Sequence, residues 1–258
     1  MNKKIVFVGL FTLLLFLSCN QDDKKEYAFN YINLSFYEQF FDNERTFVFD
    51  LETIETYPCL NFRLEVDVIS SHGKTDIYAH NIDVPDICLT ALGPAQQTLN
   101  MGDAKNVQSN ITFWVNENQH DFHLLVKDEY ITFIPGEIDE KHLFFTYDTL
   151  RRIPQNTLWG YIRNHNANNS EIIEEILQEF RLNGAEEIFL NDGKYHYFEI
   201  KNQNIVFDNL KQPTHGFFYD YDGKLEDLAE IFNQILEDYN NEELQLRMFH
   251  TSGERIMM

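Results

Sequence analysis

The chain has 258 residues, 24% of them charged and 43% hydrophobic, and its net charge at pH 7 is −22. This acidic balance excludes nucleic acids as partners and disfavours anionic lipid headgroups, because both need Lys and Arg to neutralise phosphate. A cation or a basic protein remains compatible with the charge, which by itself identifies neither.

The first residues have the pattern of an export signal. Lys3 and Lys4 precede an uncharged, mostly apolar run from Ile5 to Leu17, and the small residue Ser18 follows. A basic start, a short apolar stretch and a small residue are typical of a secretory signal peptide. The run is shorter than the ~20 residues that a membrane-spanning helix needs. We therefore expect a signal peptide rather than a transmembrane helix.

A cysteine directly follows Ser18, and this indicates a more specific type of export signal. The stretch ending in Ser18-Cys19 resembles the signal of bacterial lipoproteins, with Phe16 where Leu is usual. The resemblance implies a lipoprotein signal over residues 1–19, with Cys19 as the acylated first mature residue. Ordinary secretion is the alternative.

Residues 20–27 are expected to form an acidic tether. Within it, Asn20-Gln21-Asp22-Asp23 resembles the short acidic export signal of Bacteroidetes surface lipoproteins. That resemblance implies anchoring in the outer membrane with the protein facing the cell exterior. A location facing the periplasm is the alternative, since acids are common throughout this chain.

Two further cysteines, Cys59 and Cys88, form an even pair. In an oxidising compartment such a pair favours a disulfide. Two buried free thiols are the alternative. Neither cysteine lies in a recognisable nucleophile motif, so a catalytic role is not expected.

Residues 28–148 are predicted to be all β. Apolar and polar residues alternate there, and the longest such pattern runs from Leu60 to Val68. Several short alternating strands favour a two-sheet antiparallel sandwich of the immunoglobulin-like type. The predicted strands contain Ile32–Phe36, Phe47–Leu51, Leu60–Val68, Ile111–Val115, Phe122–Val126 and Tyr130–Ile134.

The segment from Cys88 to Gly102 resembles a pattern in Bacteroidetes lipoproteins whose first domain is immunoglobulin-like. Pro94-Ala95 precedes a predicted strand, and Met101-Gly102 occupies the turn that follows. The resemblance implies the sandwich fold and no activity.

Residues 149–157 are expected to be a linker, and residues 158–258 a second domain of α+β type. Two amphipathic helices are predicted, one after Ser170 and one from Leu225, and Asn191-Asp192-Gly193 signals a hairpin. Antiparallel strands with both helices on one face could have ferredoxin-like topology.

No catalytic, metal or cofactor site is expected. Asp220-Tyr221-Asp222-Gly223 lacks acids at the EF-hand positions held by Phe218 and Ala229, so it is interpreted as a turn. His120 and His123 lie three apart in a strand, where they face opposite sides.

Two residues are candidates for surface roles. Trp114 alternates out of phase with the apolar residues of its strand, which makes it the preferred probe of a binding surface. Asp148-Thr149-Leu150 resembles the O-glycosylation motif of exported Bacteroidetes proteins, which implies modification at Thr149.

These observations favour a lipid-anchored, surface-exposed, non-enzymatic binding protein with a protein or glycan ligand. One alternative is a carboxylate-dependent glycoside hydrolase in the C-terminal region. The other is an acidic immunity or inhibitor lipoprotein that attracts a basic partner.

Overall fold

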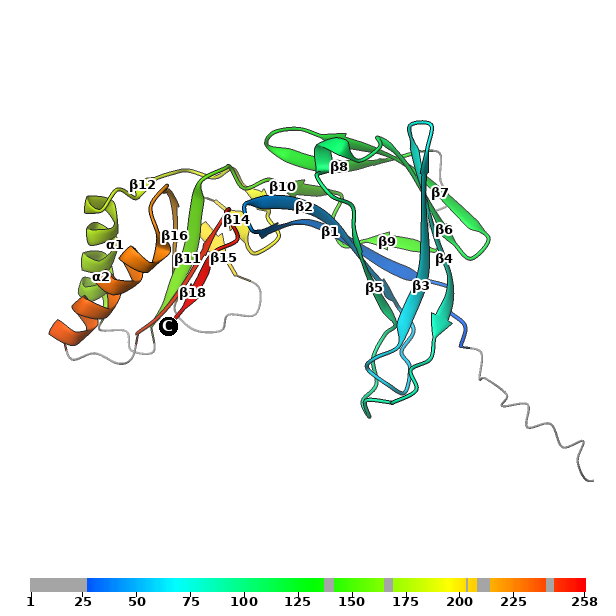
Figure 1. The fold of residues 1–258 in the computed structure, drawn as a ribbon, viewed down its shortest axis with the longest axis horizontal. Coiled ribbons are helices and arrows are strands. Elements are labelled where there is room, and N and C mark those ends of the chain that lie inside the picture. Colours follow the sequence, from blue (N-terminus) through cyan, green and yellow to red (C-terminus); the bar gives the residue numbers. More distant parts are fainter. Residues whose placement is uncertain (1–26, 137–141, 165–168, 203, 208–213, 240–243) are drawn as a thin grey trace, which may run out of the picture.

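The computed structural model describes residues 27–136, 142–164, 169–202, 204–207, 214–239 and 244–258. Cys19, the signal-like segment and nearly all of the predicted tether lie outside these residues. Within the described part of the chain, no helix is long and apolar enough to cross a membrane. Three β-sheets and two α-helices make up most of its regular structure (Figure 1).

The largest element is a ten-stranded mixed sheet, here called the curled sheet. The pairs β4/β6, β3/β5 and β1/β9 are parallel and the other neighbours are antiparallel. In spatial order its strands are β10 (Thr149–Arg151), β8 (Tyr130–Pro135), β7 (Asn118–Val126), β6 (Asn110–Val115), β4 (Lys74–Asp83), β3 (Arg63–Ser71), β5 (Gln96–Asn100), β2 (Glu44–Thr53), β1 (Ile32–Phe41) and β9 (Leu143–Phe145).

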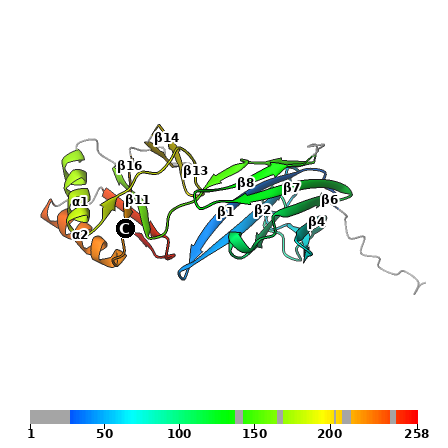
Figure 2. The same ribbon diagram turned by 90° about the horizontal axis from the view of Figure 1, so that it is seen from above.

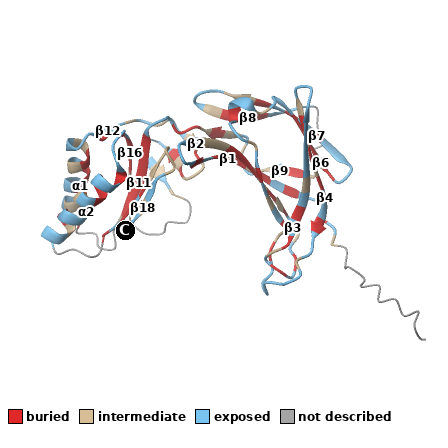
Figure 3. Cartoon of the chain, viewed as in Figure 1, coloured by how far each residue is buried: buried red, intermediate tan, exposed pale blue. Residues whose placement is uncertain are grey.

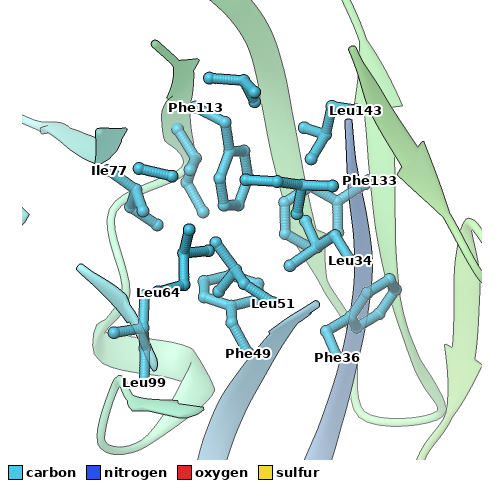
Figure 4. Packing of buried hydrophobic residues seen from close by; sticks show 14 of the residues in the cluster. Leu34, Phe36, Phe49, Leu51, Leu64, Ile77, Leu99, Phe113, Phe133 and Leu143 are labelled. Atoms are coloured by element: carbon cyan, nitrogen blue, oxygen red, sulfur yellow. The ribbon is translucent and has the colours of Figure 1, made fainter. Parts of the chain in front are cut away.

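The expected immunoglobulin-like sandwich is wrong. The sheet bends so far that its two halves cover each other: Phe36 of β1 packs on Phe133 of β8, with ring centroids 4.8 Å apart (Figure 4). Phe49 of β2 likewise meets Phe113 of β6 at 5.5 Å. Period-two alternation shows that one face of a strand is buried, but it does not show whether a second sheet or the same sheet covers that face.

One predicted strand is also shifted. The alternation from Leu60 to Val68 predicts a single apolar face, yet β3 begins only at Arg63 and its register shifts between Glu65 and Val66. Leu60 lies in the preceding loop and is 53% exposed, and Val68 is exposed as well. The alternation in the sequence does not reveal this register shift, which changes the side of the sheet to which the neighbouring side chains point.

A five-stranded antiparallel sheet, here called the helix-backed sheet, lies beside the curled sheet (Figures 1 and 2). The predicted helices are confirmed, and both lie on one face of this sheet, into which they direct their apolar stripes. The strands, in order, are β12 (Glu186–Glu187), β16 (Thr214–Asp220), β11 (Thr157–Asn164), β17 (Leu244–His250) and β18 (Arg255–Met257), and the helices are α1 (Ser170–Leu182) and α2 (Leu225–Asp238).

The ferredoxin-like α+β prediction for residues 158–258 is wrong, because the predicted hairpin does not form. Glu186–Glu187 pairs with β16 rather than with the residues after Gly193. Those residues form a separate small sheet of β13 (Gly193–Lys194), β14 (Glu199–Lys201) and β15 (Asn204–Val206). The fold is therefore predominantly β, with its two helices confined to one sheet.

A third apolar core joins the sheets. Phe40, near the end of β1, packs on Trp159 of β11 with centroids 5.6 Å apart, and Phe198 of the small-sheet region belongs to the same cluster. The Asn43 amide, in the β1–β2 turn, donates to the Ser252 carbonyl at 2.6 Å. Figure 3 shows buried residues along both β1 and β11. The domain boundaries at residues 149–157 stay a prediction.

Candidate functional site

The candidate site is a groove of about 690 Å³ where the curled sheet meets the rest of the chain, here called the junction groove. Clefts between packed units are common ligand sites because several elements contribute side chains to them. Its lining residues are Asn43, Arg45, Asp103, Lys105, Asp128, Glu129, Arg152, Ile153, Pro154, Gln155, Phe189, Leu190, Asn191 and Tyr195.

A buried ion cluster holds one wall of the groove. Glu38 of β1, only 3% exposed, accepts from Arg152 Nη2 at 2.8 Å and from Arg152 Nε at 3.1 Å. Arg45 of β2 donates to the same carboxylate at 2.9 Å. Arg152 also donates to the Lys127 carbonyl at 3.0 Å. Such charge-assisted bonds fix the two guanidinium groups in position.

Arg45 and Arg152 of this cluster both line the groove. The Arg45 guanidinium lies 4.9 Å from the Phe40 ring centroid and donates to the Ile153 carbonyl. Burial lowers the pKa of Arg45, and the Glu38 carboxylate opposes that shift. The side chain therefore links the β1–β2 hairpin to the segment after β10.

The charges that line the groove balance. The lining has three basic side chains, Arg45, Lys105 and Arg152, of which the two arginines bond to Glu38 behind the wall. It also has three acidic side chains, Asp103, Asp128 and Glu129. Lys105, in a short 3₁₀ helix (Ala104–Asn106), pairs with Asp128 at 3.2 Å. Because amides from Asn43, Gln155 and Asn191 add both donors and acceptors, this lining suits an uncharged ligand rich in hydroxyl groups.

The most exposed aromatic ring in the described structure borders the groove. Phe189 is 91% exposed, and it also lines a second hollow of about 570 Å³, together with Asn202 and Phe218. Burying such a ring would remove a large apolar surface from water. An exposed ring in the lining of two hollows can stack on a ligand bound in either.

The chain on either side of Phe189 is hydrogen-bonded to neighbouring elements. The Ile188 amide donates to the Phe218 carbonyl at 3.4 Å, and Arg151 Nε donates to the Asp192 carbonyl at 3.2 Å. Tyr195 Oη donates to the Asn191 carbonyl at 3.0 Å. Burial raises the pKa of Tyr195 to about 12, so its hydroxyl remains a donor at neutral pH.

Trp114, the residue chosen from the sequence, lies elsewhere. It is half-buried outside the core cluster, and its ring stacks on Tyr78 of β4 with centroids 5.7 Å apart. Its Nε1 donates to Asp76 at 3.3 Å. Trp114 does not line the junction groove, so its role in binding stays a prediction about a separate surface.

The other predicted residues are dispersed. Cys59 and Cys88 form the predicted disulfide. Thr149 begins β10, half-buried, with its hydroxyl 2.7 Å from that of Thr132, and its glycosylation stays a prediction. His120 is buried and His123 exposed, and no group of three potential metal ligands occurs among the described residues.

Sequence reasoning missed the groove residues for identifiable reasons. Glu38, Arg45 and Arg152 are far apart in sequence, and nothing in their local patterns signals a shared contact. Phe189 did leave a signal, because Ile188, Phe189 and Leu190 are consecutive and cannot all point to one side of a strand.

Comparison with protein-family models, curated proteins and solved structures finds no match to this chain.

Proposed function

We propose that this chain is a lipid-anchored, surface-exposed, non-enzymatic binding protein that holds an uncharged oligosaccharide in the junction groove. Cys19 provides the anchor in the outer membrane, and the groove faces the cell exterior. The observation that carries the ligand assignment is Phe189, which is 91% exposed and lines two hollows.

The ligand class follows from the groove's chemistry. An aromatic face stacks on the apolar face of a sugar ring, while amide and carboxylate groups bond to its hydroxyls. The balanced lining offers no net attraction to a charged ligand, and the acidic chain as a whole repels anionic polymers. The disulfide is typical of exported proteins.

The test uses the chain purified from membranes and immobilised linear neutral glucans, galactans and mannans as probes. For each polymer that retains the protein, titration calorimetry with soluble oligomers of the same sugar then gives the dissociation constant. We expect Phe189→Ala to weaken binding on the order of 10- to 30-fold, as truncation of an interfacial hot spot does.

Phe144→Ala is the matched control, since Phe144 is an exposed ring on β9 that does not line the groove. Equal binding by the wild type and Phe189→Ala would contradict the assignment, as would failure to bind any of the probes. Loss of binding in Trp114→Ala alone would move the site to the outer face of the curled sheet. Cleavage of a bound oligomer would instead favour the hydrolase alternative.

The anchor has its own test. A fatty-acid analogue should label the wild-type chain in cells and leave Cys19→Ala unlabelled, because acylation occurs on the thiol. Equal labelling of both would refute the anchor while leaving the groove assignment open to its separate test.

A further inference from the structure

We propose that the loop from Asp86 to Leu92 rests on the lipid surface beside the anchor. This segment is here called the docking loop. Its contact with lipid extends the proposed function and rests on the anchoring at Cys19. Three observations support this: the loop exposes apolar side chains, its backbone is held by hydrogen bonds and a disulfide, and the β2–β3 segment bonded to it contacts the start of the described chain.

The docking loop exposes an unusual run of apolar side chains. All seven residues from Asp86 to Leu92 are exposed, with Ile87 at 78%, Leu89 at 56% and Leu92 at 75%. Leu60, from the facing β2–β3 loop, is 53% exposed. Ionisable side chains are absent from Ile87 to Ala95, although 24% of the whole chain is charged. Contiguous exposed apolar residues mark a contact with a lipid or protein surface.

Hydrogen bonds and the disulfide hold the backbone of the docking loop in place. Asn61 bonds to both sides of the loop tip, donating from Nδ2 to the Ile87 carbonyl at 2.7 Å and accepting at Oδ1 from the Leu89 amide at 3.0 Å. The Leu60 amide donates to the Leu89 carbonyl at 3.1 Å, and Cys88 is bonded to Cys59. These backbone groups are satisfied within the protein, so they need no water when the loop enters an apolar phase.

The start of the described chain touches the same structure. Tyr27 packs on Tyr57 and Phe62, with ring centroids 5.7 and 4.8 Å apart. Tyr57 Oη in turn donates to the Ala28 carbonyl at 3.0 Å. The loops that connect β2 to β3 and β4 to β5 project together from one end of the curled sheet (Figure 1). The described chain therefore begins against the β2–β3 segment, which the disulfide joins to the docking loop.

The length of chain between Cys19 and Tyr27 favours lipid as the occupant. Eight residue steps separate Cys19 from Tyr27, and eight extended residues span at most about 30 Å. An acylated Cys19 would keep Tyr27 within that distance of the bilayer. An apolar loop beside it gains by entering the interface, where a second attachment strengthens a lipid anchor.

The charge pattern favours a zwitterionic surface. Asp86 at the loop's edge and the acidic chain as a whole would be repelled by anionic headgroups. The apolar residues provide the attraction, so binding should depend little on salt. Phosphatidylcholine vesicles are therefore the appropriate probe.

The experiment places a fluorescent ring on the docking loop. Full-length Leu89→Trp is reconstituted into phosphatidylcholine vesicles with and without brominated acyl chains, and emission is corrected for Trp114 and Trp159 with the wild type. We expect the added emission to be blue-shifted and quenched at least ~2-fold by brominated lipid. Leu182→Trp, at an exposed site on α1, should not be quenched.

The outcomes separate this inference from the anchor. If Leu89→Trp is unquenched while the chain floats with the vesicles, the inference fails and the anchor stands. Concentration-dependent self-association that Leu89→Ser abolishes would also overturn it, assigning the loop to a second copy of the chain. A second test uses a tryptophan probe at position 60, introduced by Leu60→Trp, in protein whose acylation at Cys19 has been shown by labelling. Adding Ile87→Ser, Leu89→Ser and Leu92→Ser together should abolish the quenching of this probe by brominated lipid.

Discussion

The Tyr37 ring of β1 lies parallel to the His196 imidazole, with ring centroids 3.8 Å apart and planes 7° apart. This stack joins the curled sheet to the segment between β13 and β14. Burial, with a smaller contribution from Lys194, lowers the pKa of His196 to about 4, although Asp50 opposes the shift. The contact between the sheets therefore contains a histidine that stays neutral where a free one would be protonated.

The first prediction concerns pH. The unfolded chain binds a proton at His196 near pH 6.5 and the folded chain only near 4, so protonation favours unfolding between these values. This contribution to stability is complete above pH 6.5 and declines as the pH falls. We expect the free energy of unfolding of His196→Phe, which keeps the stacking, to fall about 2–2.5 kcal/mol less than that of the wild type between pH 7.5 and 4.5. Urea unfolding at both pH values measures the difference, and identical losses would contradict the prediction.

The second prediction concerns the buried ion cluster. Glu38→Ala leaves Arg45 and Arg152 without their shared carboxylate, and we expect it to lower the free energy of unfolding by about 3–5 kcal/mol. Glu174→Ala is the control, because its ion pair with Arg181 is solvent-exposed and worth under about 1 kcal/mol. Chemical denaturation compares the two variants, and similar costs would show that burial of the cluster does not matter.

The third prediction concerns the contact between β16 and the small sheet. A Cβ at Gly216 would overlap Cγ2 of Ile205, so we expect Gly216→Ala to cost about 1–3 kcal/mol. Ile205→Ala should relieve the overlap, and the double variant should be more stable than the sum of the two single losses implies. A double-mutant cycle from thermal unfolding measures this coupling. Strict additivity would argue against the contact.

The fourth prediction concerns the disulfide. Cys59 and Cys88 are 29 residues apart, and opening a loop of that size costs roughly 3–4 kcal/mol in the chain-entropy model. The variant with both Cys59→Ser and Cys88→Ser should show that loss in urea unfolding. Added reductant should destabilise the wild type and leave this variant unchanged. If the reductant destabilised both the wild type and the double variant, the loss of stability would have a cause other than the disulfide.

Local structure was predicted well wherever one chain segment decides it. Both helices follow from their apolar stripes, and Ile32, Leu34 and Phe36 are buried on β1 as their alternation indicates. The disulfide was predicted from an even pair of cysteines. These features depend on periodicity or composition, which a single sequence displays.

The candidate site could not be predicted in the same way. Glu38 and Arg152 meet across 114 residues, and the groove exists only because strands far apart in sequence are adjacent. The sandwich prediction failed for the same reason, since the parallel pairing of β4 with β6 leaves no local mark. Phe189 follows β12, which ends at Glu187, and its exposure depends on the distant elements around it.

The sequence by itself determined the export-like start, the acidic charge, the two helices and the inward faces of most strands. Only the tertiary structure decided that one sheet curls to cover its own core, that an ion cluster fixes a groove, and that Phe189 and the docking loop remain exposed. The physical reason is that alternation and helical periodicity record burial along one segment, whereas pairing between distant strands decides what covers each buried face.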